Sequence, residues 1–133
     1  YVRAMLQEIR AFEPIAYELE FSEERIAIHG MLIAVGNGST YGGGMRVCPG
    51  ADIRDGLASI LIVGALPRLS FLRLFPKVFS GSHVHHPVTQ VLSAASFTLH
   101  APGQTVYADG EPIGPAPVRL QVEPLAVQII GAP

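Results

Sequence analysis

The amino-acid sequence predicts a mainly β fold, a β-sandwich with two short helices. Residues 15–21 alternate apolar side chains with polar or small ones, which is the pattern of a half-buried strand. Residues 56–65 are rich in Ile, Leu and Val, which indicates a buried strand. From Val88 onward the patterns are those of strands and turns. Many short strands with few helical segments favour packed sheets.

The first part of the chain predicts a helix and then a hairpin. Apolar residues recur at three- and four-residue spacing over residues 1–12, and Pro14 is expected to end this helix. The strand over residues 15–21 then turns back into a second strand over residues 25–35, which becomes apolar on both faces. Residues 36–44 contain five glycines, which predicts a loop or a bulged edge.

The rest of the chain predicts one more helix and a series of strands. The helix covers residues 69–79, and Pro76 must kink or divide it. We expect strands over residues 91–99, 105–108, 118–122 and 126–130. Asp109-Gly110 is a strong turn sequence, which we place between the second and third of these strands. Since no repeat or long linker divides the chain, residues 1–133 are expected to form one domain.

Composition and charge exclude some classes of protein. The net charge of −2 and the pI near 6.2 give no basic surface for nucleic acid. Hydrophobic residues make up 49% of the chain and charged residues only 15%, so part of the apolar surface is expected to meet a further domain or a lipid. One cysteine cannot form an internal disulfide, and no apolar run is long enough to span a bilayer. These features predict a cytoplasmic protein.

Two pairs of acidic residues are candidates for chemistry. Asp52 and Asp55 flank a tight turn and could hold a hard cation through a carboxylate and nearby carbonyl groups, or they could simply form the turn. Asp109 and Glu111 lie two positions apart around Gly110. One of them could act as a general base while the other contacts a metal, or both could be solvated acids at a hairpin tip.

Other potentially reactive groups have weaker patterns. His83, His85 and His86 are dense enough for metal ligation, but no cysteine or acid completes a ligand set, which favours a role at the surface or at the mouth of a cleft. His29 and His100 are expected to be satisfied residues of strands. Cys48 has no adjacent base and is expected to pack in the interior. The glycine-rich stretch lacks the Lys-Ser/Thr ending of a phosphate loop, which favours a structural role.

The order of several short motifs is more specific than any one of them. Along the chain these are Asn37 with Gly42-Gly43-Gly44-Met45, Pro49 to Ala51, Asp55-Gly56-Leu57, Gly81 and His83 with Pro87-Val88, and Asp109-Gly110-Glu111-Pro112. From about Tyr17 to the end, this series resembles the C-terminal domain of the diacylglycerol kinase and sphingosine kinase family of soluble bacterial lipid kinases.

The resemblance implies a two-domain, ATP-dependent lipid kinase. This chain would be its C-terminal β-sandwich domain. An N-terminal α/β domain, absent here, would carry the nucleotide site and bind most of the ATP, so the isolated chain is expected to be inactive. The acceptor would be the hydroxyl of a diacylglycerol-like or sphingoid lipid, with transient contact at the membrane surface, and a homodimer is left open. A non-catalytic lipid-binding sandwich and a metal-dependent enzyme that uses the three clustered histidines are the alternatives.

The resemblance also implies roles for individual residues. Glu111 would be the general base, with Asp109 as its neighbour. A structural Mg²⁺ would be held by the Asp55 side chain and by the backbone carbonyls of Asp52 and Leu57. His85, His86 and Ser39-Thr40 depart from the family pattern, so the lipid acceptor is not specified.

Overall fold

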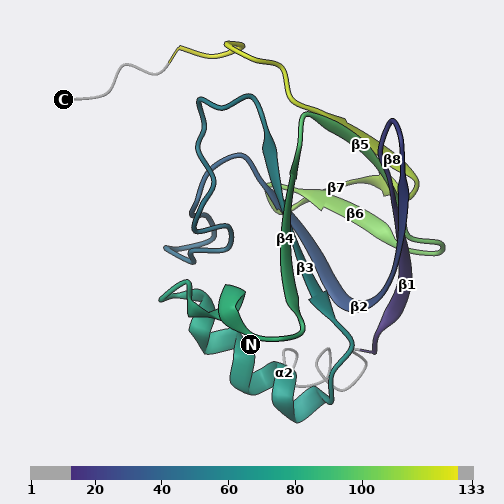
Figure 1. Cartoon of the computed structure of the whole chain (residues 1–133), viewed down its shortest axis with the longest axis vertical. Coiled ribbons are helices and arrows are strands. Elements are labelled where there is room, and N and C mark those ends of the chain that lie inside the picture. The colour runs from purple at the N-terminus through teal and green to yellow at the C-terminus, as the bar shows by residue number, and fades with distance from the viewer. Residues whose placement is uncertain (1–12, 129–133) are drawn as a thin grey trace.

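The computed structural model describes residues 13–128. In chain order the elements are β1 (Ile15–Glu20), β2 (Arg25–Gly36), β3 (Ala58–Gly64), α2 (Arg68–Leu74), the 3-10 helices η1 (Phe75–Val78) and η2 (Ser82–His85), β4 (Thr89–Ala94), β5 (Ser96–His100), β6 (Thr105–Ala108), β7 (Glu111–Pro115) and β8 (Val118–Gln121) (Figure 1). The helix expected over residues 1–12 lies outside the described residues.

Six strands form one antiparallel sheet that folds over on itself. The strand order is β4-β3-β2-β1-β5-β8. Only Ala95 separates β4 from β5 in the chain, yet β3, β2 and β1 lie between them in the sheet. The sheet therefore has to curl, which brings β5 and β8 opposite β3 and β4 (Figure 1). This arrangement confirms the predicted mainly β, sandwich-like fold.

An apolar interior fills the fold of the sheet. Ile60 and Ile62 of β3 pack there with Phe97 and Leu99 of β5 and with Leu19 of β1. All five side chains are at most 8% exposed. Their burial shows that the two halves of the sheet close on one core, since residues that alternate along a strand share one face.

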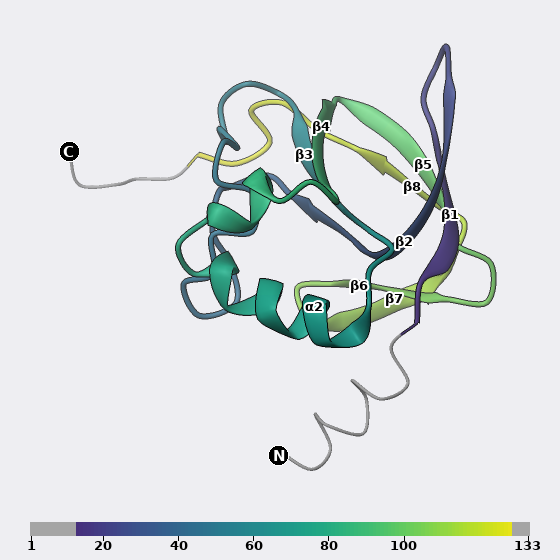
Figure 2. The same ribbon diagram turned by 60° about the horizontal axis from the view of Figure 1, so that its bottom comes forward.

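The helices cover the outer face of β3 (Figure 2). Leu61 and Val63, which alternate with the interior residues of β3, pack against Leu74 of α2 and Val78 of η1. Cys48 joins this second core from the loop between β2 and β3. Both faces of β3 are thus buried, which explains the unbroken Ile, Leu and Val run in its sequence.

Three predicted elements differ from the structure. The strand expected over residues 91–99 is two strands, because the chain turns a corner at Ala95. The hairpin partner of β6 is β7, not the strand near residues 118–122, which pairs with β5 as β8. Residues 126–128 form no strand, and the rest of that expected strand is outside the described range. The division of the second helix at Pro76 is confirmed, since α2 ends at Leu74 and η1 begins at Phe75.

Candidate functional site

The turn between β6 and β7 carries two of the predicted site residues. Asp109 has a φ of 50° and Gly110 a φ of 87°, the left-handed conformation at both central residues of a two-residue hairpin turn. Ala108 pairs with Glu111 across the hairpin, so Glu111 is the first residue of β7. The predicted turn is confirmed, and it holds the two exposed acidic side chains on either side of Gly110.

The hairpin that carries these acids is separate from the main sheet. β6 and β7 form a two-stranded sheet that runs across the direction of β3 and β4 (Figure 1). Tyr107 is 64% exposed and Ile113 is 58% exposed. Two-stranded hairpins are marginally stable alone in water, and this one leaves large apolar side chains uncovered. The hairpin therefore presents apolar and acidic groups together at the surface.

The turn over residues 52–57 is closed by its own aspartates. The Asp55 carboxylate accepts a hydrogen bond from the Leu57 N–H at 2.8 Å, and the Asp55 N–H donates to the Asp52 carbonyl at 3.3 Å. The Asp52 carboxylate accepts from the backbone N–H and the Nε of Arg54, and these hydrogen bonds hold its pKa below the ordinary value. The turn thus joins the backbones of Asp52 and Asp55, and the Arg54 guanidinium pairs with the Asp52 carboxylate at 3.3 Å.

The glycine-rich stretch folds into a small closed loop. Tyr41 and Met45 exchange both backbone hydrogen bonds, at 3.0 and 3.1 Å, across Gly42, Gly43 and Gly44. These three glycines have φ values of 60°, 77° and 93°, which residues other than glycine rarely adopt. The loop does not lead into a helix, as a phosphate loop does, which supports the structural role favoured from the sequence.

The three clustered histidines do not share a site. They lie in and just after the 3-10 helix η2. His83 is 3% exposed, which corrects the surface role predicted for it. Its Nε2 lies 3.0 Å from the Val47 carbonyl, so Nε2 carries the proton, and the buried Nδ1 has no partner among residues 13–128.

His85 and His86 are less buried and point to different surroundings. His85 is exposed and lines a hollow of about 530 Å³ with Arg46, Ser80 and Ser82. His86 is half-buried and its Nδ1 lies 3.4 Å from the N–H of Val88. A role at the mouth of a hollow is therefore supported for His85.

Cys48 is part of the core. Its thiol is fully buried and lies 3.7 Å from the carbonyl of Ser59. Burial raises the pKa of this thiol, which disfavours the thiolate that a nucleophile requires. The packing role predicted for Cys48 is confirmed.

One polar cluster was not anticipated from the sequence. Glu18 and Glu20 of β1 lie beside His100 of β5 and Arg25 of β2. The His100 Nε2 lies 2.8 Å from Glu20, and Arg25 contacts Glu18 at 3.2 Å and Glu20 at 2.7 Å. The hydrogen bond from His100 is the main cause of a lowered pKa of Glu20, and Arg25 adds to it. Glutamates two residues apart on a strand indicate a shared face, but the pairing with β5 was not predicted.

This cluster is also where potential metal-ligating side chains converge. Within the described part of the chain, Glu18, Glu20 and His100 are the three such groups whose ligand atoms lie within 4.8 Å of one another. Arg25 forms ion pairs with both carboxylates, so the arrangement is a polar network that links three strands.

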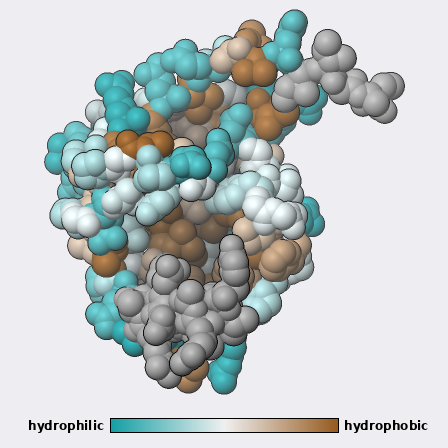
Figure 3. Space-filling view, turned by 180° about the vertical axis from the view of Figure 1, so that it is seen from behind, coloured by the Kyte–Doolittle hydropathy of each residue, from teal (hydrophilic) through white to brown (hydrophobic). Residues whose placement is uncertain are grey.

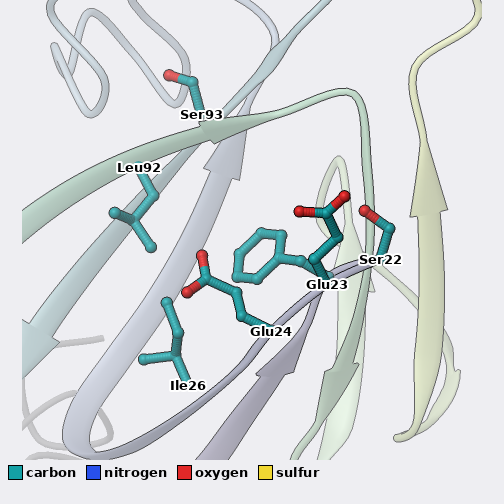
Figure 4. Close-up of a pocket in the computed structure, with 7 residues that line it drawn as sticks. Ser22, Glu23, Glu24, Ile26, Leu92 and Ser93 are labelled. Carbon is teal, nitrogen blue, oxygen red and sulfur yellow. The ribbon is translucent and has the colours of Figure 1, made fainter.

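A hollow of about 570 Å³ lies between the tip of the β1–β2 hairpin and β4 (Figure 4). The Glu24 carboxylate points between Ile26 and Leu92, while Glu23 and Ser22 lie farther along the hairpin. This hollow is therefore lined by both apolar and acidic side chains, and none of the site residues predicted from the sequence lines it. No helix within residues 13–128 has the length and apolar character needed to cross a bilayer.

The comparisons with known proteins agree with the fold and with the motifs. The sequence model of the YegS C-terminal NAD kinase β-sandwich-like domain matches residues 1–131. A diacylglycerol kinase of Mycobacterium tuberculosis strain H37Rv is 36% identical over 131 residues, which are 98% of this chain and 42% of the relative. A Pectobacterium atrosepticum protein named "Probable lipid kinase YegS-like" is 32% identical over 114 residues, covering 78% of this chain and 37% of that protein.

A solved structure shows the same fold. The crystal structure of a diacylglycerol kinase from Bacillus anthracis str. Sterne superposes with a TM-score of 0.64 at 21% identity, over 93% of this chain and 47% of that one. This chain thus spans less than half the length of the relatives that it matches. The family match over nearly the whole chain confirms the resemblance seen in the motifs. The chain belongs to the YegS C-terminal NAD kinase β-sandwich-like domain family, whose relatives are named as diacylglycerol kinases and lipid kinases.

Proposed function

We propose that this chain is the C-terminal domain of a kinase that transfers the γ-phosphate of ATP to the hydroxyl group of a lipid. Relatives at 36% and 32% identity are named diacylglycerol kinase and lipid kinase. The chain covers 42% of the first relative, which leaves room for a separate nucleotide-binding domain. The acceptor is a diacylglycerol-like or sphingoid lipid, which supplies a hydroxyl group for phosphorylation.

The observation that carries this proposal is the placement of Glu111. Its carboxylate is exposed, it starts a strand directly after a rigid two-residue turn, and residues 13–128 provide no ion pair for it. A lipid hydroxyl has a high pKa, so a carboxylate that accepts its proton as the new O–P bond forms lowers the barrier. We assign Glu111 as this general base. Asp109, on the other side of Gly110, is its neighbour in the turn.

We further propose that the turn over residues 52–57 holds a divalent cation of the Mg²⁺ type. Its proposed ligands are the Asp55 carboxylate and the backbone carbonyls of Asp52 and Leu57, and hard oxygen ligands suit Mg²⁺. A cation bound there would cross-link the loop that leads into β3. In this proposal its role is to stabilise the domain.

The decisive experiment replaces Glu111 in the complete kinase. Glu111→Gln keeps the shape of the side chain but removes the proton acceptor, so kcat should fall by about 10²- to 10⁴-fold. The affinity for ATP and the melting temperature should stay unchanged, since the side chain is exposed and makes no ion pair within residues 13–128. The measurement is transfer of labelled phosphate from ATP to a panel of lipids.

Two further variants make this experiment specific. Asp109→Asn should also lower kcat, and it changes the residue that begins the turn, so its melting temperature must be followed. Glu123→Gln removes an exposed carboxylate elsewhere and should leave turnover at the wild-type level. If Glu111→Gln retains wild-type turnover on its best lipid, the general base lies outside this hairpin.

A non-catalytic lipid-binding domain is the second candidate function. The hollow between the β1–β2 hairpin and β4, which apolar Phe21, Ile26 and Leu92 line in part, favours it. It predicts that the complete protein binds lipids but transfers no phosphate to any member of the panel. The labelled-ATP assay therefore separates the two functions.

A further inference from the structure

We propose that α2 and η1 form a docking surface for membranes that contain anionic phospholipids. This inference rests on the proposed function, because a lipid kinase must reach its substrate at a membrane. The physical claim stands apart from catalysis, since binding to a vesicle requires no phosphate transfer.

Charge along the sequence is unevenly distributed. No aspartate or glutamate occurs between Asp55 and Asp109, although the chain has 11 acidic residues. Three of the nine lysine and arginine residues, Arg68, Arg73 and Lys77, fall within ten positions of this acid-free stretch. The helical segment is therefore positive on a chain whose net charge is −2.

The same segment exposes large apolar side chains. Leu69 is 68% exposed, Phe75 52% and Phe79 54%. Leu74 and Val78, which lie between them in sequence, are at most 8% exposed and fix the segment to the second core. The exposed side chains are therefore held in place by a buried face of the same helices. An aromatic and aliphatic face beside cationic groups is typical of segments that lie in the interface of a bilayer.

A small basic hollow adjoins these apolar residues. It has a volume of about 190 Å³ and is lined by Ser70, Arg73, Leu74, Lys77 and His86. Arg73 and Lys77 form no ion pair within residues 13–128, whereas Arg68 is paired with Glu13 at 2.6 Å. Two cationic groups, a hydroxyl and an imidazole around one hollow provide donors for a phosphate oxygen.

The combination favours a lipid over a free anion. A hollow for inorganic phosphate needs no exposed phenylalanine beside it, and an apolar surface for a protein partner needs no cluster of cations. An anionic phospholipid satisfies both features, because its phosphate can enter the basic hollow while its acyl region receives the apolar side chains. We therefore assign the headgroup to Arg73, Lys77 and His86, and the acyl region to Leu69, Phe75 and Phe79.

Vesicle sedimentation tests the proposal with the whole 133-residue chain and with the complete kinase. Vesicles of phosphatidylcholine with about one third phosphatidylglycerol should bind the protein, vesicles of pure phosphatidylcholine should bind it weakly, and salt should reduce the difference. Arg73→Gln with Lys77→Gln should weaken binding roughly 30-fold, since each basic residue near an anionic surface contributes about fivefold. Phe75→Ser with Phe79→Ser should also weaken it.

Matched double variants provide the controls. Arg54→Gln with Arg119→Gln removes two exposed charges from the turn over residues 52–57 and from β8, and Tyr107→Ser with Ile113→Ser removes two exposed apolar groups from the β6–β7 hairpin. Both controls should bind vesicles like the wild type. Melting temperatures should be unchanged in all four double variants, because the replaced side chains are exposed.

Several results would overturn the docking surface. It is wrong if the Arg73 and Lys77 double variant binds anionic vesicles like the wild type, or if pure phosphatidylcholine binds equally well. Full competition by millimolar inorganic phosphate would mean a free-anion site, and lipid-independent self-association that Phe75→Ser abolishes would mean an interface between copies of this chain. A complete protein that binds vesicles through this segment but phosphorylates no lipid would contradict the proposed function and leave the docking surface standing.

Discussion

At the scale of single residues, the turn over residues 52–57 depends on Asp55 in two separable ways. Its carboxylate caps the Leu57 N–H at 2.8 Å, and it is the one side-chain ligand that we assign to a Mg²⁺ ion. Asparagine retains an oxygen that can accept the hydrogen bond but loses the negative charge, whereas alanine loses both. The two substitutions therefore distinguish a simple turn from a cation site.

We expect added Mg²⁺ to raise the melting temperature of the complete kinase and Asp55→Asn to abolish that rise. In Asp55→Ala, Mg²⁺ should also fail to raise the melting temperature, and the melting temperature without Mg²⁺ should fall by roughly 2 °C, because a turn hydrogen bond of about 1 kcal/mol is lost. The measurement is thermal unfolding with Mg²⁺ and with a chelator. An undiminished response to Mg²⁺ in Asp55→Asn would show that residues 52–57 form an ordinary turn.

What the sequence could reveal about single residues depends on how local their partners are. The Asp109-Gly110 turn was predictable because these two residue types tolerate positive φ and the turn involves only its immediate neighbours. The burial of His83 was not, because its partner is the carbonyl of Val47, 36 positions earlier. The pairing of Glu20 with His100 joins residues 80 positions apart and was missed for the same reason.

At the scale of elements, an irregularity in β2 positions one core side chain. Gly30 pairs with Gly64 and Leu32 with Val63, so Met31 is an extra residue in the pairing of β2 with β3. Met31 is 2% exposed and enters the core beneath the helices. A β-bulge redirects a side chain in this way, and the close approach of the strands at Gly30 is part of it.

Gly30→Ala should therefore destabilise the domain. A Cβ atom at Gly30 would lie 2.7 Å from the backbone carbonyl oxygen of Val63, which cannot move without shifting the sheet. We expect a loss of about 1–3 kcal/mol in the free energy of unfolding, measured by denaturant titration of the chain. Gly50→Ala is the control, since nothing lies within 4 Å of the added atom, and it should change stability by less than about 0.5 kcal/mol. Equal midpoints for the two variants would rule out this role for Gly30.

The elements that were predicted correctly have strong periodicity within one segment. β1, β2, β3 and the helix divided at Pro76 follow from alternation, from an apolar run or from a proline. β7 was missed because its sequence, EPIGP, contains two prolines and a glycine, which are usual in turns. A two-stranded sheet has only edge strands, where proline is tolerated. The corner at Ala95 was missed because no glycine, proline or charged residue marks it within residues 91–99, so only tertiary packing separates β4 from β5.

At the scale of the whole molecule, apolar surface remains uncovered on more than one side. Seen from behind, apolar side chains lie at the bottom of a hollow with polar side chains above it (Figure 3). The β6–β7 hairpin exposes Tyr107 and Ile113 beside the acids of its turn. A chain that covers 42% of a longer relative is expected to leave such surface for the remainder of the protein. The low content of charged residues, 15%, likewise predicted that part of the apolar surface meets a further domain or a lipid.

The last prediction follows from the proposal that a separate domain binds ATP. Phosphoryl transfer is mostly positioning and charge neutralisation, so it requires a loop that holds the phosphates of ATP. The glycines at positions 42–44 lie in a closed loop between Tyr41 and Met45, without the lysine and the helix that a phosphate loop provides. The general base assigned to Glu111 has no phosphate donor to act on within this chain. The 133-residue chain should therefore neither bind ATP at micromolar concentration nor transfer its phosphate.

Calorimetric titration of the chain with ATP and Mg²⁺ is the measurement, and the complete kinase titrated under the same conditions is the positive control. A cooperative melting transition of the chain must accompany the titration, because an unfolded domain would also fail to bind. The complete kinase should bind ATP and phosphorylate its lipid. Adding the separate chain should not change the number of ATP molecules bound per molecule of complete kinase. Binding of ATP to the folded chain at micromolar affinity would mean that this domain holds the nucleotide itself. In that case the assignment of ATP to a second domain would be wrong, while the assignment of Glu111 would still rest on its own substitution.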